Sequence, residues 1–128
     1  MEEIRVLIVD DSSVMRKIVE RALRQAGLDS LTVHEAGSGT DGLEVLKSTR
    51  VDLVLSDINM PSMDGLEFLR QIRTRGLASG TPIVMITTES SEEHVKQAIR
   101  AGAKGYIRKP FTPDQVKERV LPLLSNSR

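Results

Sequence analysis

Short apolar runs of strand length alternate along this chain with segments in which apolar residues recur at helical spacing. The clearest runs lie at 5–9, 51–56 and 83–86, and apart from Asp52 their interior is aliphatic and rich in β-branched residues. Uninterrupted runs of this kind are typical of strands that are covered on both faces. Strand and helix signals alternate five times, which predicts right-handed crossovers and a mostly parallel sheet between two layers of helices.

Weaker signals complete this α/β pattern. Strands are expected at 31–36, near a sheet edge, and at 105–108. Pro122 is expected to bend or fray the last helix, because proline lacks the backbone donor that a helix interior needs. Helical spacing marks the residues expected to face the core, which in the first and fourth helices are Met15, Ile18, Val19, Ala22, Ala26, Val95, Ala98 and Ile99.

Length and charge narrow the function classes. The 128 residues fit one domain, so residues 1–128 are expected to form a single unit without a linker. Eighteen basic and eighteen acidic residues balance, which argues against binding nucleic acid or an anionic membrane by bulk charge. The chain has no cysteine, and its first residues lack a signal-peptide pattern. We therefore expect a soluble, cytoplasmic protein with neither nucleic acid nor membrane as partner.

Polar and charged residues follow four of the predicted strands at the point where each ends. Asp10 and Asp11 follow the first, Asp57 the third, Thr87 the fourth and Lys109 the fifth. The carboxyl ends of parallel strands share one edge of a sheet, so these side chains are expected to meet. Three neighbouring carboxylates repel one another unless a cation or a shared proton is present. An oxygen-only set without histidine or cysteine indicates Mg²⁺ rather than zinc.

The same residues suit a phosphoryl group. Lys109 offers a mobile positive charge and Thr87 a hydroxyl donor, while a carboxylate such as Asp57 is an established phosphoryl acceptor. Each residue also has a structural interpretation when taken alone. Asp10 and Asp11 could simply cap the following helix, and Asp64 before Gly65 is most simply a helix cap. The convergence of all four positions favours the chemical interpretation.

Four motifs give the chain a specific resemblance over residues 4–124. They are Val-Asp-Asp-Ser-Ser around Asp10, Ser-Asp-Ile-Asn-Met-Pro-Ser-Met-Asp-Gly around Asp57, the lone Thr87, and Gly-Tyr-Ile-Arg-Lys-Pro-Phe around Lys109. In this order they resemble bacterial two-component response-regulator receiver domains, and among these the single-domain chemotaxis, CheY-like type. The resemblance implies a three-layer, doubly wound (βα)5 sandwich of the flavodoxin-like, CheY-like kind. Its five-stranded parallel sheet would have the order 2-1-3-4-5.

The resemblance also implies a role for each matching residue. Asp57 would accept the phosphoryl group from a histidine kinase and bind Mg²⁺ together with Asp11 and the backbone carbonyl of Asn59. Asp10 would reach the metal through water. Lys109 would pair with the acid and then with a phosphoryl oxygen.

Further positions match the switch of this family. Thr87 would be drawn onto the phosphoryl group, and the ring of Tyr106 would turn inward behind it. Asn59 and Glu89 would tune spontaneous dephosphorylation, and the Lys109–Pro110 peptide is expected to be cis.

The implied function is a signalling switch rather than a dedicated enzyme, although the domain would catalyse its own phosphoryl transfer and autodephosphorylation. Partner binding would change through the face of the fourth helix, fifth strand and fifth helix. The expected partners of this monomer are a chemotaxis-type histidine kinase, a downstream protein effector such as the flagellar motor switch, and a phosphatase. Residues 90–93 replace a more basic stretch of enteric members, so binding to the motor is not assured.

Alternatives remain open within and outside this family. A phosphate sink, a phosphorelay intermediate and a non-motile output would all use the same site. A flavodoxin-type electron carrier shares the topology, but Asp10 and Asp11 would repel the phosphate of its flavin. An aspartyl phosphatase needs a second acid two residues after its nucleophile, where this chain has Asn59. A pseudo-receiver would lack part of the acid, hydroxyl and lysine set.

Overall fold

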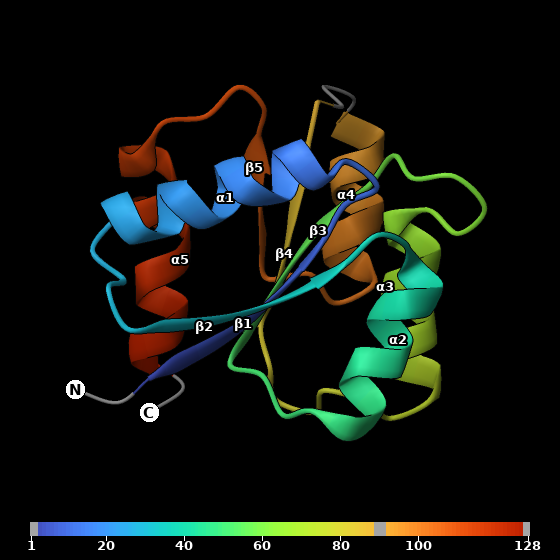
Figure 1. Ribbon diagram of the computed structural model, residues 1–128. Coiled ribbons are helices and arrows are strands. Elements are labelled where there is room, and N and C mark those ends of the chain that lie inside the picture. Colours follow the sequence, from blue (N-terminus) through green and yellow to red (C-terminus); the bar gives the residue numbers. More distant parts are fainter. Residues whose placement is uncertain (1–2, 89–91, 127–128) are drawn as a thin grey trace.

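The computed structural model describes residues 3–88 and 92–126, which form five strands and five helices in strict alternation (Figure 1). Their bounds are β1 Ile4–Val9, α1 Ser13–Gln25, β2 Leu31–Ala36, α2 Gly39–Ser48, β3 Leu53–Asp57, α3 Gly65–Thr74, β4 Ile83–Thr87, α4 Glu92–Arg100, β5 Gly105–Arg108 and α5 Pro113–Asn126. No described helix combines the length and the apolar character needed to cross a bilayer.

The five strands form one parallel sheet in the order β2-β1-β3-β4-β5. The predicted fold class and strand order are therefore confirmed. β1 lies between β2 and β3, and its register pairs Val9 with Ala36 on one side and with Ser56 on the other. Because all strands run the same way, the loops that follow β1, β3, β4 and β5 emerge at the same edge of the sheet.

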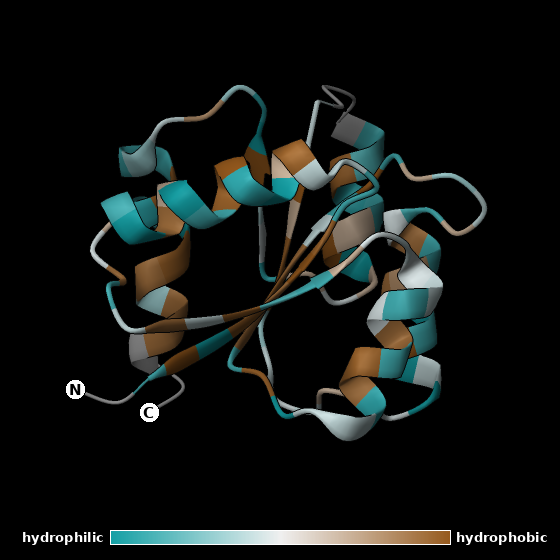
Figure 2. Cartoon of the chain, viewed as in Figure 1, coloured by the Kyte–Doolittle hydropathy of each residue, from teal (hydrophilic) through white to brown (hydrophobic). Residues whose placement is uncertain are grey.

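Helices cover both faces of the sheet. α1 and α5 lie on one face, while α2, α3 and α4 lie on the other (Figure 1). Each face has its own apolar cluster: Ile8 and Leu55 pack toward α1 and α5, and Leu7 and Val54 pack toward the other three helices. The hydropathy colouring shows the same division, with apolar strands at the centre and polar outer helix surfaces (Figure 2).

Two helices begin immediately beyond the edge where the chemistry is expected. Ser12 caps α1, because its hydroxyl accepts a hydrogen bond from Met15 N at 3.1 Å. Asp64 caps α3, where its carboxylate accepts from Glu67 N at 2.9 Å. The interpretation of Asp64 as a helix cap is therefore confirmed. These caps fix where the loops after β1 and β3 end.

Several sequence predictions differ from the structure. β3 begins at Leu53 rather than at residue 51; Asp52 lies just before it, and its carboxylate accepts a hydrogen bond from Arg5 N. Ile18 and Ile99 were expected in the core, but both are exposed. Each is next in sequence to a buried residue, Val19 or Ala98, but its own side chain lies at the edge of the buried helix face. Pro122 lies inside α5, which continues to Asn126; the expected bend at this proline stays a prediction.

Candidate functional site

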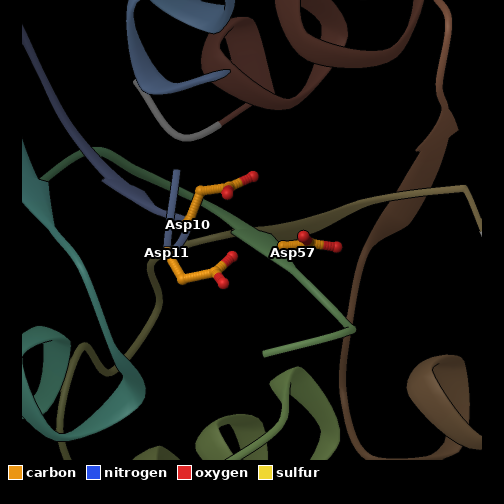
Figure 3. A group of neighbouring side chains, drawn as sticks. All are labelled: Asp10, Asp11 and Asp57. Atoms are coloured by element: carbon orange, nitrogen blue, oxygen red, sulfur yellow. The ribbon is translucent and has the colours of Figure 1, made fainter. Parts of the chain in front are cut away.

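Three carboxylates meet at the carboxyl edge of the sheet. Asp10 and Asp11 follow β1, Asp57 ends β3, and one carboxylate oxygen of each lies within 4.8 Å of the others. The three side chains project to the same side of the strands (Figure 3). β1 and β3 are hydrogen-bonded neighbours, and this adjacency brings together acids that are more than forty residues apart in the sequence.

Asp57 is one of two buried acids at this edge, the other being Asp10. Its Oδ1 accepts a hydrogen bond from Asn59 N at 3.2 Å, and its Oδ2 lies 3.3 Å from Lys109 Nζ. Burial raises the pKa of the Asp57 carboxyl above its ordinary value, Lys109 acts in the opposite direction, and Asp10 adds a further increase. The carboxylate is thus poorly solvated and depends on nearby positive charge.

Lys109 supplies that charge from the end of β5. Its Nζ lies 3.2 Å from Asp10 Oδ2 and 3.3 Å from Asp57 Oδ2, so one ammonium bridges two buried acids. The backbone of Lys109 is fixed by a 2.8 Å hydrogen bond from its N–H to Thr87 O. The Lys109–Pro110 peptide bond is cis.

Asp10 and Asp11 differ in how far the protein satisfies them. Asp10 is buried, and both of its oxygens are engaged, one by Ser12 N at 2.9 Å and the other by Lys109. Asp11 is exposed, and within residues 3–88 and 92–126 its carboxylate has no hydrogen bond or ion pair. Asp11 therefore has both carboxylate oxygens available for a ligand. Each oxygen of Asp10 already accepts one hydrogen bond, so Asp10 can bind a ligand only through its remaining lone pairs.

The loop after β3 passes very close to the site. A side chain at Gly65 would collide with the backbone oxygen of Asp57, and its Cβ would lie 2.7 Å from Ile58 Cα. Gly65 N also donates to Ile58 O at 2.7 Å. Only glycine permits this approach, which brings the start of α3 against the end of β3 after the loop 58–64. Asn59 in this loop is exposed.

The remaining predicted site residues lie around this centre. Thr87 ends β4 and is fully buried. Tyr106 lies one strand further, half-buried, with the guanidinium carbon of Arg119 5.6 Å from its ring centroid. Glu89 falls outside the described residues.

The donor set fits a hard divalent cation. The three acids offer only oxygen ligands, and within the described chain they are the one group of at least three acids, histidines or cysteines spaced for a metal. Mg²⁺ prefers a small number of carboxylates and keeps other positions for water or substrate oxygens. Asp11 and Asp57 are the residues best placed to bind it directly, with Asp10 behind them.

One contact at this edge had no signal in the sequence. Arg16, in the second turn of α1, donates from Nη1 to the backbone oxygen of Asp10 at 2.6 Å. Its Nε is 2.8 Å from Glu35 Oε1 on β2. The residues are ordinary for a helix surface and a strand, so their meeting depends on the pairing of β1 with β2.

The sequence of this chain is similar to those of known proteins. The sequence profile of the response regulator receiver domain matches residues 6–121. The chain is 40% identical over 119 residues to the chemotaxis protein CheY-3 of Vibrio cholerae, covering 93% of this chain and 90% of that protein. It is also 40% identical over 121 residues to a chemotaxis protein CheY homolog of Campylobacter jejuni, covering 94% and 92%.

Solved structures agree with these relatives. The chemotaxis protein CheY4 of Vibrio cholerae superposes with a TM-score of 0.84 at 35% identity, covering 95% of this chain and 99% of that one. The signal receiver domain of the response regulator NarL from Mycobacterium tuberculosis gives 0.84 at 32% identity, covering 98% of both chains.

Proposed function

The chain belongs to the response regulator receiver domain family, whose CheY-like members are two-component signalling switches, and we propose that phosphorylation of Asp57 activates this one. The carrying observation is that Lys109 bridges the buried carboxylates of Asp57 and Asp10 while the oxygens of Asp11 remain available. A static ion pair would need no third acid. An acceptor site for a phosphoryl group and a divalent cation needs all of these groups.

The transfer follows from the position of Asp57. An oxygen of its carboxylate attacks the phosphorus of a phosphohistidine on a kinase, so an O–P bond forms and the P–N bond breaks. The electron pair of that bond stays on the histidine nitrogen, which is protonated from water. Mg²⁺, when bound, neutralises charge on the phosphoryl oxygens. Lys109 Nζ, which now contacts Asp57 Oδ2, is placed to pair with a phosphoryl oxygen once that carboxylate oxygen becomes part of the new bond.

We propose that phosphorylation changes the conformation of the elements next to the site. Thr87 closes β4 directly before the segment that leads to α4, and its hydroxyl is a donor for the new phosphoryl oxygens. Displacing Thr87 changes the packing of Tyr106 on β5, and therefore the surface of α4, β5 and α5. A nearly complete shift between two states needs about 5.5 kcal/mol. Charge-assisted hydrogen bonds at about 1.5–3 kcal/mol each supply this with about two to four contacts.

The names of the relatives support a proposal for the biological setting. Both compared curated proteins are named chemotaxis proteins. We therefore propose a cytoplasmic role in chemotaxis or motility, with a histidine kinase upstream and a protein effector such as the flagellar motor switch downstream. A phosphate sink would show no partner whose binding depends on phosphorylation. Partner capture with and without beryllofluoride, a phosphoryl mimic, distinguishes the two.

Phosphoryl transfer is tested with radiolabelled acetyl phosphate, a small donor that removes the need for the kinase. We expect label on the wild-type chain only when Mg²⁺ is present, lost after treatment with mild alkali because acyl phosphates hydrolyse readily. Asp57→Asn should take up none. Asp52→Asn is the matched control, because Asp52 lies just before the opposite end of β3 and its replacement should leave labelling unchanged. Equal labelling of Asp57→Asn would refute the assignment.

A further inference from the structure

Arg16 connects the acid site to the edge of the sheet. Its Nη1 donates to the carbonyl oxygen of Asp10 at 2.6 Å, and its Nε contacts Glu35 Oε1 at 2.8 Å. The side chain is largely buried, and its guanidinium makes both contacts from the same planar fork. Lys17 holds the other oxygen of Glu35 at 2.9 Å.

This contact restrains the Asp10–Asp11 peptide. The carbonyl of Asp10 and the N–H of Asp11 belong to one planar unit, so fixing the carbonyl also fixes where the Asp11 backbone starts. The N–H of Asp10 is separately held by Ala36 O at 3.1 Å. The N–H of Asp10 is thereby held directly by β2, and its carbonyl is held by Arg16 of α1, which pairs with Glu35 of β2. Asp11, the exposed acid, gains its orientation from this anchoring, because its side chain has no described partner.

Glu35 keeps Arg16 in place and offsets its charge. Hydrogen bonds from Lys17 and from Arg16 hold the pKa of Glu35 below its usual range, so its carboxylate stays ionised. A lone cation beside three acids would compete with a metal ion. Paired with Glu35, Arg16 can hold the Asp10 carbonyl with part of its positive charge offset.

We propose that Arg16 is a positioning residue for the divalent-cation site, acting through the main chain of Asp10 to orient Asp11. This inference rests on the proposed function, because it needs the acids to bind a cation. Arg16 itself contacts neither the cation nor the phosphoryl group. Residues that orient metal ligands typically change metal affinity by about ten- to a hundredfold when they are replaced.

The direction in which Mg²⁺ affinity changes distinguishes a positioning role of Arg16 from an effect of its charge. Arg16→Gln removes a positive charge near three carboxylates, so electrostatics alone would tighten Mg²⁺ binding. Loss of positioning would weaken it, and we expect about tenfold weaker binding. Arg16→Lys keeps the charge, yet a single ammonium cannot reproduce the forked contact with Asp10 and Glu35. We therefore expect Arg16→Lys to bind Mg²⁺ more weakly than wild type as well.

Lys17→Gln is the matched control. Lys17 pairs with the same Glu35 carboxylate, is exposed, and has no described contact with Asp10. Its removal changes the local charge by the same amount as Arg16→Gln. We expect its Mg²⁺ affinity to stay at the wild-type value or to rise slightly.

The experiment is calorimetric titration of Mg²⁺ into each unphosphorylated full-length variant at fixed ionic strength, with circular dichroism to verify folding. Weaker binding by Arg16→Gln and Arg16→Lys with unchanged Lys17→Gln supports the proposal. If Arg16→Gln fails to fold, Arg16→Lys decides alone. Wild-type affinity or tighter binding in the Arg16 variants overturns the inference and leaves the proposed function intact. Absence of Mg²⁺ binding by the wild type overturns both.

Discussion

Replacing Lys109 with methionine removes the positive charge between two buried acids and keeps most of the side chain's apolar stem. Side-chain exposure is only 12% for Lys109, 6% for Asp10 and 9% for Asp57, so water can do little to replace the lost ammonium. We expect Lys109→Met to be strongly destabilised in the absence of metal at neutral pH.

The structure gives the size of this effect. The ammonium lies 3.2 Å and 3.3 Å from the two carboxylate oxygens. At an effective dielectric constant of about 20, each contact represents about 5 kcal/mol of gross attraction. The desolvation of three charged groups offsets most of this attraction. Removing one partner of a buried ion pair costs about 3–5 kcal/mol, because it leaves an uncompensated charge, and we expect a loss of free energy of unfolding in that range.

Two conditions should restore the variant. Lys109 lowers the pKa of Asp57, so its loss raises that pKa further. The deficit should therefore shrink as the pH falls through the raised pKa, because protonated Asp57 no longer needs a counter-charge. Mg²⁺ should restore stability as well, and more in the variant than in wild type, since it then supplies the missing positive charge.

Urea unfolding followed by far-ultraviolet circular dichroism suits this chain, which has no tryptophan. Lys104→Met is the control: Lys104 is an exposed lysine just before β5, and its replacement should change the free energy of unfolding by less than about 0.5 kcal/mol. A Lys109→Met protein as stable as Lys104→Met at neutral pH without metal would refute the electrostatic reasoning.

Three further predictions concern the same edge of the sheet. Gly65→Ala should destabilise the protein by about 1–3 kcal/mol or more, because the new Cβ would meet the backbone of Asp57 and Ile58; Gly105→Ala, which has open space, is its control in urea unfolding. Asp57→Asn should be more stable than wild type at neutral pH without Mg²⁺, because burial raises the pKa of the folded Asp57 carboxyl above 3.8. The stability that this shift contributes to the wild type is fully present below pH 3.8 and is lost as the pH rises through the raised folded-state pKa; a stability gap that persists in acid would contradict this. Asp64→Ala should cost about 1 kcal/mol by removing the cap of α3, and Asp64→Asn should recover most of it in thermal unfolding.

The sequence predicted the architecture well because burial on both faces leaves a strong pattern. The apolar runs of β1, β3 and β4 can be read directly, and parallel pairing then places residues 10, 57 and 109 at one edge. The order of the strands came from the family resemblance, since periodicity alone does not distinguish which strands are neighbours. The buried faces of the helices were harder to predict. Ile18 and Ile99 fit the apolar spacing, but they lie at the edge of the buried face and are exposed to solvent.

Side-chain partnerships at the site could be predicted only in part. The sequence indicated that Lys109 would meet the acids, but not that its ammonium would bridge Asp10 and Asp57. Nor did it indicate that the Asp11 side chain would have no partner among the described residues. Arg16 and Glu35 had no signal, because a charged pair on a helix and an edge strand is common on protein surfaces. Such contacts depend on the angle at which α1 crosses the sheet, and no local pattern in the sequence encodes that angle.

The claim that Asp11 and Asp57 bind one divalent cation is tested most directly by a crystal of the protein grown with Mn²⁺, an oxygen-liganded cation whose anomalous scattering reveals its position. We predict a single strong anomalous peak at the carboxyl edge of β1 and β3, at coordination distance from an oxygen of both acids. A crystal grown at saturating Mn²⁺ that shows no anomalous peak at this edge, or shows its only peak elsewhere on the surface, would contradict the account.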